Sequence, residues 1–136
     1  MFDLLWAETI DKTKPTLLIV SGVFQYFHEE KVITFINALR DIFVKAELIF
    51  DAANETGIKY ANKYVQRTGN MNALMRFFVN DGASFAEKTK TVLVEERVFF
   101  TDARTMLAKK LSVYTRVAMR VVDNKKRAIL LHLRLN

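Results

Sequence analysis

Ser21, Gly22 and His28 are the residues whose types and spacing best suit the binding of a ligand. Ser21 and Gly22 directly follow the apolar run 17–20, and the missing Cβ of a glycine lets a ligand come close to the backbone. His28 follows in the next turn, and histidine is the residue type that most often serves as a general base. We interpret these residues as the edge of a ligand crevice. The simpler alternative is an ordinary strand-to-loop turn and an exposed histidine at a helix start.

Phe24, Tyr26 and Asp51 are expected near the same place. Phe24 and Tyr26 stand in the turn after Gly22, where they either line a pocket or pack in the core. Asp51 ends the next predicted strand, which suits a site residue or a helix-capping residue equally. Because the carboxyl ends of parallel strands meet at one edge of a sheet, we expect Asp51 to lie near Ser21.

A strand, a helix and a second strand must position these residues. The stretch 15–22 is predicted to be a fully buried strand because it is apolar and partly β-branched. A second strand is predicted over 46–52, and a crossover of this length is right-handed, so the two strands should be parallel. Between them lies a predicted helix over 28–44, whose apolar residues recur at helical spacing: Val32, Phe35, Ile36, Leu39, Ile42 and Phe43.

The rest of the chain is expected to add two strands and several helices. Helices are predicted over 56–66, 70–79, 83–88 and 103–122, and strands over 91–100 and 128–135. The resulting order, β-α-β-(α,α)-β-α-β, indicates a single α/β domain over residues 1–136.

The composition is that of a folded protein and excludes several kinds of site. The chain has 136 residues, of which 51% are hydrophobic and none is cysteine. The lack of cysteine excludes a disulfide framework, a thiolate metal site and a cysteine nucleophile. No His, Asp or Glu cluster has ligand spacing, so we predict no metal site. Without a signal-peptide pattern or an apolar run of about 20 residues, we expect a cytoplasmic protein with no membrane contact.

The whole chain has a net charge of +6, and its positive charge is concentrated near the carboxyl-terminal end. Such a segment can contact phosphates, but we favour a solvated helix face followed by a basic turn. No RNA-binding aromatic signature, helix-turn-helix pattern or zinc spacing is present, which argues against a nucleic-acid-binding protein. From Arg104 onward the only acidic residue is Asp123, and the basic residues are Arg104, Lys109, Lys110, Arg116, Arg120, Lys125, Lys126, Arg127 and Arg134.

The order of several motifs resembles one enzyme family over nearly the whole chain. The segment Phe2-Asp3-Leu4-Leu5-Trp6, the strand 15–22 and the segments 79–82 and 94–96 occur in the family's order. The chain is similar to the carboxyl-terminal half of leucine carboxyl methyltransferase-like enzymes, which include tetracenomycin-type polyketide O-methyltransferases. The residues at matching places are Asp3, Trp6, Gly22, Tyr26, Glu29, Glu30 and Asp51.

This resemblance implies a class I, Rossmann-like fold that binds S-adenosyl-L-methionine. The four strands would be the fourth to seventh of a mostly parallel sheet, and the last would lie antiparallel between the second and third strands of this chain. Ser21, Gly22 and Tyr26 would bind the cofactor, and Phe24 and His28 would face the methyl acceptor. The resemblance assigns no catalytic residue, and the protein would act chiefly by positioning the reactants.

Two departures from the family shape the expected function. Ser21 stands where the family usually has Glu, and the four glycines are too far apart to form a glycine-rich cofactor loop. We therefore expect a partial O-methyltransferase, inactive alone, whose amino-terminal half is missing and whose acceptor is a carboxylate or hydroxyl of a small molecule. The alternative is a non-catalytic interaction module that dimerises through the exposed sheet edge 15–22.

Overall fold

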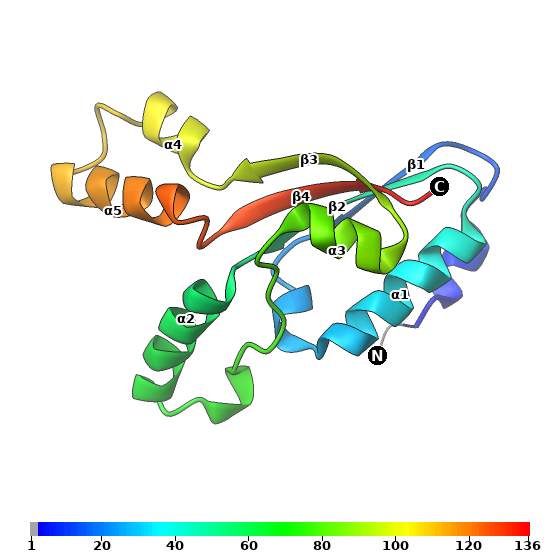
Figure 1. Ribbon diagram of the computed structural model, residues 1–136, viewed down its shortest axis with the longest axis horizontal. Helices are drawn as coiled ribbons and strands as arrows, with labels where there is room; N and C mark the ends of the chain where they lie inside the picture. The colour runs from blue at the N-terminus through cyan, green and yellow to red at the C-terminus, as the bar shows by residue number, and fades with distance from the viewer. Residues whose placement is uncertain (1–2) are drawn as a thin grey trace.

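A four-stranded mixed sheet forms the centre of the computed structural model, which describes residues 3–136 (Figure 1). Phe2 of the resemblance motif lies outside the described residues. The strands are β1 (Thr16–Val20), β2 (Ala46–Ala52), β3 (Val92–Val98) and β4 (Ile129–Arg134), in the order β1-β2-β4-β3. β1 and β2 are parallel, whereas β4 is antiparallel to both β2 and β3. The predicted sheet, with its antiparallel last strand between the second and third strands, is confirmed.

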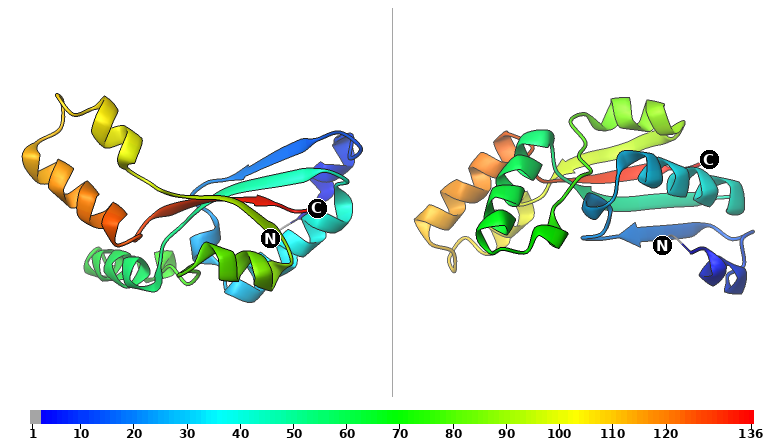
Figure 2. Two further views of the ribbon diagram at one scale, coloured as in Figure 1. Left: turned by 45° about the horizontal axis from the view of Figure 1, so that its top comes forward. Right: turned by 90° about the horizontal axis from the view of Figure 1, so that it is seen from below.

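Three helices lie together on one face of this sheet. They are α1 (Glu29–Ile42), α2 (Glu55–Arg67) and α3 (Gly82–Thr89). α1 and α3 lie over the strands, whereas α2 is on the same side but beyond the strand ends (Figure 2). Two more helices, α4 (Thr101–Met106) and α5 (Val113–Asn124), form a hairpin that extends from one end of the sheet between β3 and β4. Short 3-10 turns occur at Leu5–Thr9, Phe24–Tyr26 and Met71–Ala73. Among residues 3–136, no helix is long and apolar enough to cross a membrane.

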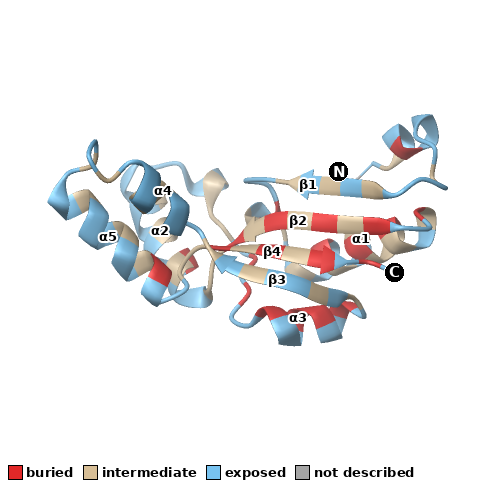
Figure 3. Ribbon diagram, turned by 90° about the horizontal axis from the view of Figure 1, so that it is seen from above, coloured by how far each residue is buried: buried red, intermediate tan, exposed pale blue. Residues whose placement is uncertain are grey.

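The core lies between the sheet and α1, as the helical spacing predicts. Val32, Ile36 and Leu39 of α1 are completely buried. In β2 every second residue is buried, because successive side chains of a strand point to opposite faces. Figure 3 shows this alternation along β2 and β4. An aromatic cluster completes the core, and its rings belong to Phe24, Phe50, Phe77 and Phe85.

β1 is not the fully buried strand that its apolar sequence suggests. Leu17 and Ile19 are 54% and 68% exposed, because they alternate along the strand with Leu18 and Val20, which pack against the core. Figure 3 shows β1 without a buried residue. β1 is also the edge of the sheet, and no strand in the described part of the chain pairs with its outer side. The strand therefore has the apolar composition that is typical of a central strand, although it lies at the edge of the sheet.

The predicted helix over 70–79 is wrong. Apart from the turn Met71–Ala73, this segment is extended, and its backbone bonds to other parts of the molecule. The backbone carbonyl oxygen of Gln25 accepts hydrogen bonds from the backbone N–H groups of Arg76 and Phe77. The side-chain amide of Asn62 accepts a hydrogen bond from the backbone N–H of Met75 and donates one to its carbonyl oxygen. These long-range hydrogen bonds replace the bonds within a helix.

The single helix predicted over 103–122 is also wrong, because the chain breaks between α4 and α5. Ser112 begins α5 by accepting a hydrogen bond from the backbone N–H of Thr115 at 3.1 Å. This is the usual role of serine at a helix start. Asp102 lies inside the first turn of α4 instead of capping the helix.

Candidate functional site

The carboxyl ends of β1 and β2 are joined by a hydrogen bond between Gly22 and Asp51. The backbone N–H of Gly22 donates to Oδ1 of Asp51 at 2.6 Å, so the two strand ends meet as the sequence predicts. Gly22 has a φ of +68°, a left-handed conformation that favours glycine. Apart from the residues next to Gly22 in the chain, no atom of residues 3–136 lies within 4 Å of the place where a Cβ would be, so the backbone is open to a ligand here.

Asp51 does not cap a helix. That role belongs to Asn54, whose side chain accepts from the backbone N–H of Gly57 at 2.8 Å at the start of α2. The sequence left two roles open for Asp51, that of a site residue and that of a helix cap. Its contact with Gly22 favours the role of a site residue at the sheet edge.

The structure separates the other predicted site residues. Ser21 is exposed at the end of β1, and Tyr26 is 42% exposed in the turn that follows. His28 occupies the N-cap position of α1, where its Nε2 lies 3.5 Å from Nη1 of Arg76. Phe24 is 1% exposed and packs against the ring of Phe50. Phe24 therefore has the core role that the sequence left open, and it offers no accessible surface to an acceptor.

A hollow of about 270 Å³ opens beside Asp51 at the same end of the sheet. Its wall is mostly apolar and comes from segments far apart in the sequence, with a few polar groups, as is common for small-molecule sites. Sequence reasoning missed nearly all of these residues, because no spacing relates them before the chain folds. The lining residues are Gln25, Asp51, Ala52, Ala53, Gly57, Ile58, Ala61, Met75, Phe99, Phe100, Arg127 and Ala128.

Arg127 provides the positive charge in this wall. Its guanidinium lies 4.5 Å from the centre of the Tyr60 ring, a cation–π distance. Its Nε is buried and has no hydrogen-bond partner. A Cβ on Gly57 would lie 2.4 Å from the carbonyl oxygen of Arg127. The absence of a side chain at Gly57 therefore lets α2 approach the turn that carries Arg127.

Two more ionic groups order the neighbouring turns. Lys126 donates to Glu96 at 2.7 Å, and this bond raises the pKa of the Lys126 ammonium above its ordinary value. Asp81 caps α3 by accepting from the backbone of Ser84 at 2.7 Å, and its bonds to Ser84 lower the pKa of the Asp81 carboxyl. Glu96 also accepts from the backbone of Gly82. The two bonds of Glu96 tie the start of α3 and the turn before β4 to β3.

The arrangement suits binding and positioning. It offers an open glycine backbone, an apolar hollow, the Asp51 carboxylate and the Arg127 guanidinium. No group of three or more His, Cys, Asp or Glu residues in the described part of the chain could hold a metal ion. His28 lies beside the cationic Arg76.

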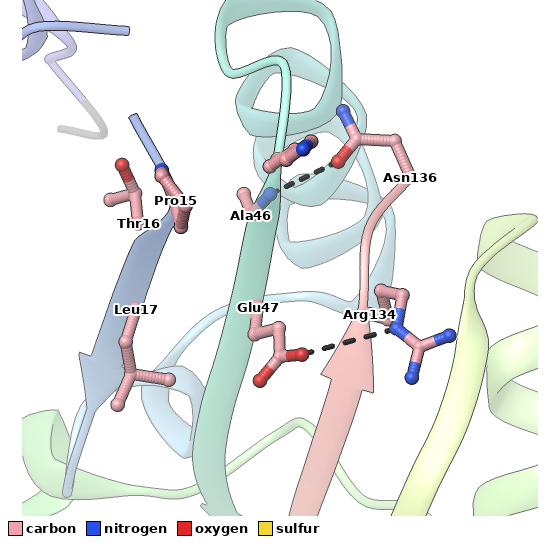
Figure 4. Close-up of a pocket in the computed structure, with 8 residues that line it drawn as sticks. Pro15, Thr16, Leu17, Ala46, Glu47, Arg134 and Asn136 are labelled. Carbon is pink, nitrogen blue, oxygen red and sulfur yellow. Dashed lines mark hydrogen bonds and ion pairs between the residues drawn. The ribbon is translucent and has the colours of Figure 1, made fainter. Parts of the chain in front are cut away.

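A larger hollow, of about 500 Å³, lies at the opposite end of β1 and β2 (Figure 4). It is crossed by ordered polar contacts: Asn136 accepts from the backbone N–H of Ala46 at 3.0 Å, and Glu47 lies 3.9 Å from Arg134. In open α/β sheets, ligands bind outside the carboxyl ends of the strands. We therefore take the smaller hollow beside Asp51 as the candidate site.

Comparisons with known proteins identify the fold. No protein-family model and no curated protein sequence matches the chain. Among solved structures, it is similar to a DUF574 family protein from Streptomyces avermitilis, with a TM-score of 0.59 and 18% identity over 93% of this chain and 47% of that one. It is also similar to magnesium protoporphyrin IX methyltransferase (ChlM) from Synechocystis PCC 6803 with bound SAH, with a TM-score of 0.51 and 11% identity over 94% of this chain and 48% of that one.

The chain thus spans about half the length of these two structures. Their likeness to the β1-β2-β4-β3 sheet, together with its helices on one face, bears out the fold predicted from the sequence. The protein has an α/β fold similar to about half of a methyltransferase structure such as ChlM.

Proposed function

We propose that the chain is one part of an S-adenosyl-L-methionine-dependent O-methyltransferase similar to the leucine carboxyl methyltransferase-like enzymes. Its acceptor would be a carboxylate or hydroxyl of a small molecule. The observation that carries the proposal is the open strand-end turn at Gly22, tied to Asp51 in a methyltransferase fold. The SAH bound to ChlM supports the cofactor.

The residues at this edge fit one wall of a cofactor site. Ser21 offers an exposed hydroxyl, Gly22 an open backbone and Tyr26 a partly exposed ring. A bound cofactor would supply a methyl group on a sulfonium for transfer to the acceptor oxygen, with S-adenosylhomocysteine as the leaving group. These residues would orient the two reactants, and His28 would stand on the acceptor's side.

The uncovered face of the sheet supports the view that this part works with another. Leu17 and Ile19 leave apolar surface exposed along a β1 edge that is free to pair with a further strand. The structures that it resembles are about twice as long. We propose that a complementary half, on another chain or another part of a longer one, pairs with β1 and covers this face.

The test compares the purified 136-residue chain with the complex that it forms in the cells that produce it. We expect no calorimetric binding of S-adenosylhomocysteine by the chain alone. We expect methyl transfer by the recovered complex, reduced at least about tenfold by Asp51→Ala, since that residue holds the Gly22 turn. Binding of S-adenosylhomocysteine by the chain alone with a Kd near micromolar, about −8 kcal/mol, would contradict the proposal that the chain lacks part of its site. A complex without methyl transfer would overturn the function.

A second candidate function is an interaction module that forms a homodimer through β1. The exposed side chains of Leu17 and Ile19 on an unpaired edge favour it. Sedimentation should then show a dimer that becomes a monomer in Ile19→Lys. The control is Lys63→Ala, which changes an exposed residue of α2, outside β1. A monomer at all concentrations would contradict this candidate.

A further inference from the structure

The α4–α5 hairpin carries the net charge of the whole protein. Residues 101–127 include eight basic residues and two acidic ones, Asp102 and Asp123, which leaves +6. The rest of the chain contains thirteen basic and thirteen acidic residues and is therefore neutral. Positive charge placed on one hairpin attracts anions to that part of the surface.

Three arginines of this hairpin meet at one hollow of about 350 Å³ between α4 and α5. Arg116 and Arg120 are four residues apart on α5 and thus share a face of the helix. Arg104 faces them from α4. The complete lining is Thr101, Arg104, Thr105, Val113, Arg116, Val117 and Arg120.

The positive charge of the hollow is only partly compensated. Arg104 donates through Nη2 to the buried Asp123 carboxylate at 2.9 Å, whereas its Nε is buried without a partner. Arg116 and Arg120 make no ion pair with any residue in the range 3–136. The guanidinium charges of Arg116 and Arg120 therefore remain for a ligand.

We propose that this hollow binds the phosphate group of a small phosphorylated molecule. A guanidinium presents several N–H donors in a planar fork that matches phosphate oxygens, and such bonds are among the strongest hydrogen bonds in proteins. The convergence of three arginines on one concavity favours a single compact phosphate over an extended nucleic-acid backbone. The site is separate from the Asp51 hollow and goes beyond the proposed methyltransferase function.

The experiment titrates the full chain with inorganic pyrophosphate by calorimetry and maps the shifted backbone amides by NMR. Saturable binding is expected, with shifts confined to residues 101–105 and 113–120. The double variant Arg116→Gln and Arg120→Gln should raise the Kd at least about tenfold, because it removes both uncompensated guanidiniums. Both side chains are exposed, so thermal unfolding should be unchanged and a folding defect can be recognised separately.

The matched control is the double variant Lys109→Gln and Lys110→Gln. It removes the same charge from the connection between α4 and α5, outside the hollow, and should change the Kd less than about threefold. Equal weakening by both double variants would show general attraction to the basic hairpin and overturn the site. Absence of pyrophosphate binding would do the same. Tighter binding of a single-stranded oligonucleotide, weakened equally by both variants, would establish an extended nucleic-acid surface instead.

Discussion

Phe24→Ala is expected to lower the free energy of unfolding by about 3–5 kcal/mol, the usual cost of truncating a buried phenylalanine. The ring of Phe24 is 1% exposed, and its centre lies 5.1 Å from that of Phe50 and 6.3 Å from that of Phe77. The substitution would leave a cavity where three parts of the chain meet and would remove these edge-on ring contacts. Urea unfolding followed by circular dichroism measures the loss.

Tyr26→Ala is the control for Phe24→Ala. Tyr26 lies in the same 3-10 turn but is 42% exposed, so its truncation should cost less than about 1 kcal/mol. Similar losses for the two variants would contradict the core role of Phe24. Phe24→Leu, which retains most of the volume, should recover much of the stability.

Asp123→Asn should be the second most damaging of the proposed changes, with a loss of about 2–4 kcal/mol. Asp123 is 3% exposed and accepts from the backbone N–H of Phe100 at 2.9 Å and from Arg104 at 2.9 Å. An amide would carry no charge to balance Arg104, and its NH₂ group would face other donors. Urea unfolding gives the total loss, and hydrogen exchange at the Phe100 amide reports on the base of the hairpin.

Asp102→Asn is the control for Asp123→Asn, because it also removes one carboxylate from the α4–α5 hairpin. The Asp102 side chain is 65% exposed and pairs with Arg97, and exposed pairs contribute at most about 1 kcal/mol. We expect little change in unfolding for this variant. A loss as large as that of Asp123→Asn would show that the burial of Asp123 is not what makes it important.

The strands and α1 could be predicted from the sequence because their hydrophobic patterns match what they bury. The spacing of Val32, Ile36 and Leu39 predicts the buried face of α1, and all three are completely buried. The exposed face of β1 could not be predicted in this way. Leu17 and Ile19 have the composition of a core strand, whereas their burial depends on whether anything covers that face.

The helix predicted over 103–122 is interrupted by the local cap at Ser112, whereas the one predicted over 70–79 failed because contacts distant in sequence outweighed local preference. Asn62 holds Met75 in an extended segment through two hydrogen bonds, and nothing in the spacing of residues 70–79 reveals that partner. The candidate site shows the same limit. Gly22 and Asp51 could be paired from the rule that parallel strand ends meet, whereas Arg127 and Phe100 reach the hollow only through the return of β4 into the sheet.

The place of β4 also determines when the protein can fold during its synthesis. β4 follows β2 and β3 in the sequence, yet it separates these two strands, which do not pair with each other. A nascent chain that has not yet exposed β4 therefore has two incomplete halves, with the inner edges of β2 and β3 open. Unpaired edges of this kind are prone to wrong association, so both halves stay open to it until β4 takes its place in the sheet.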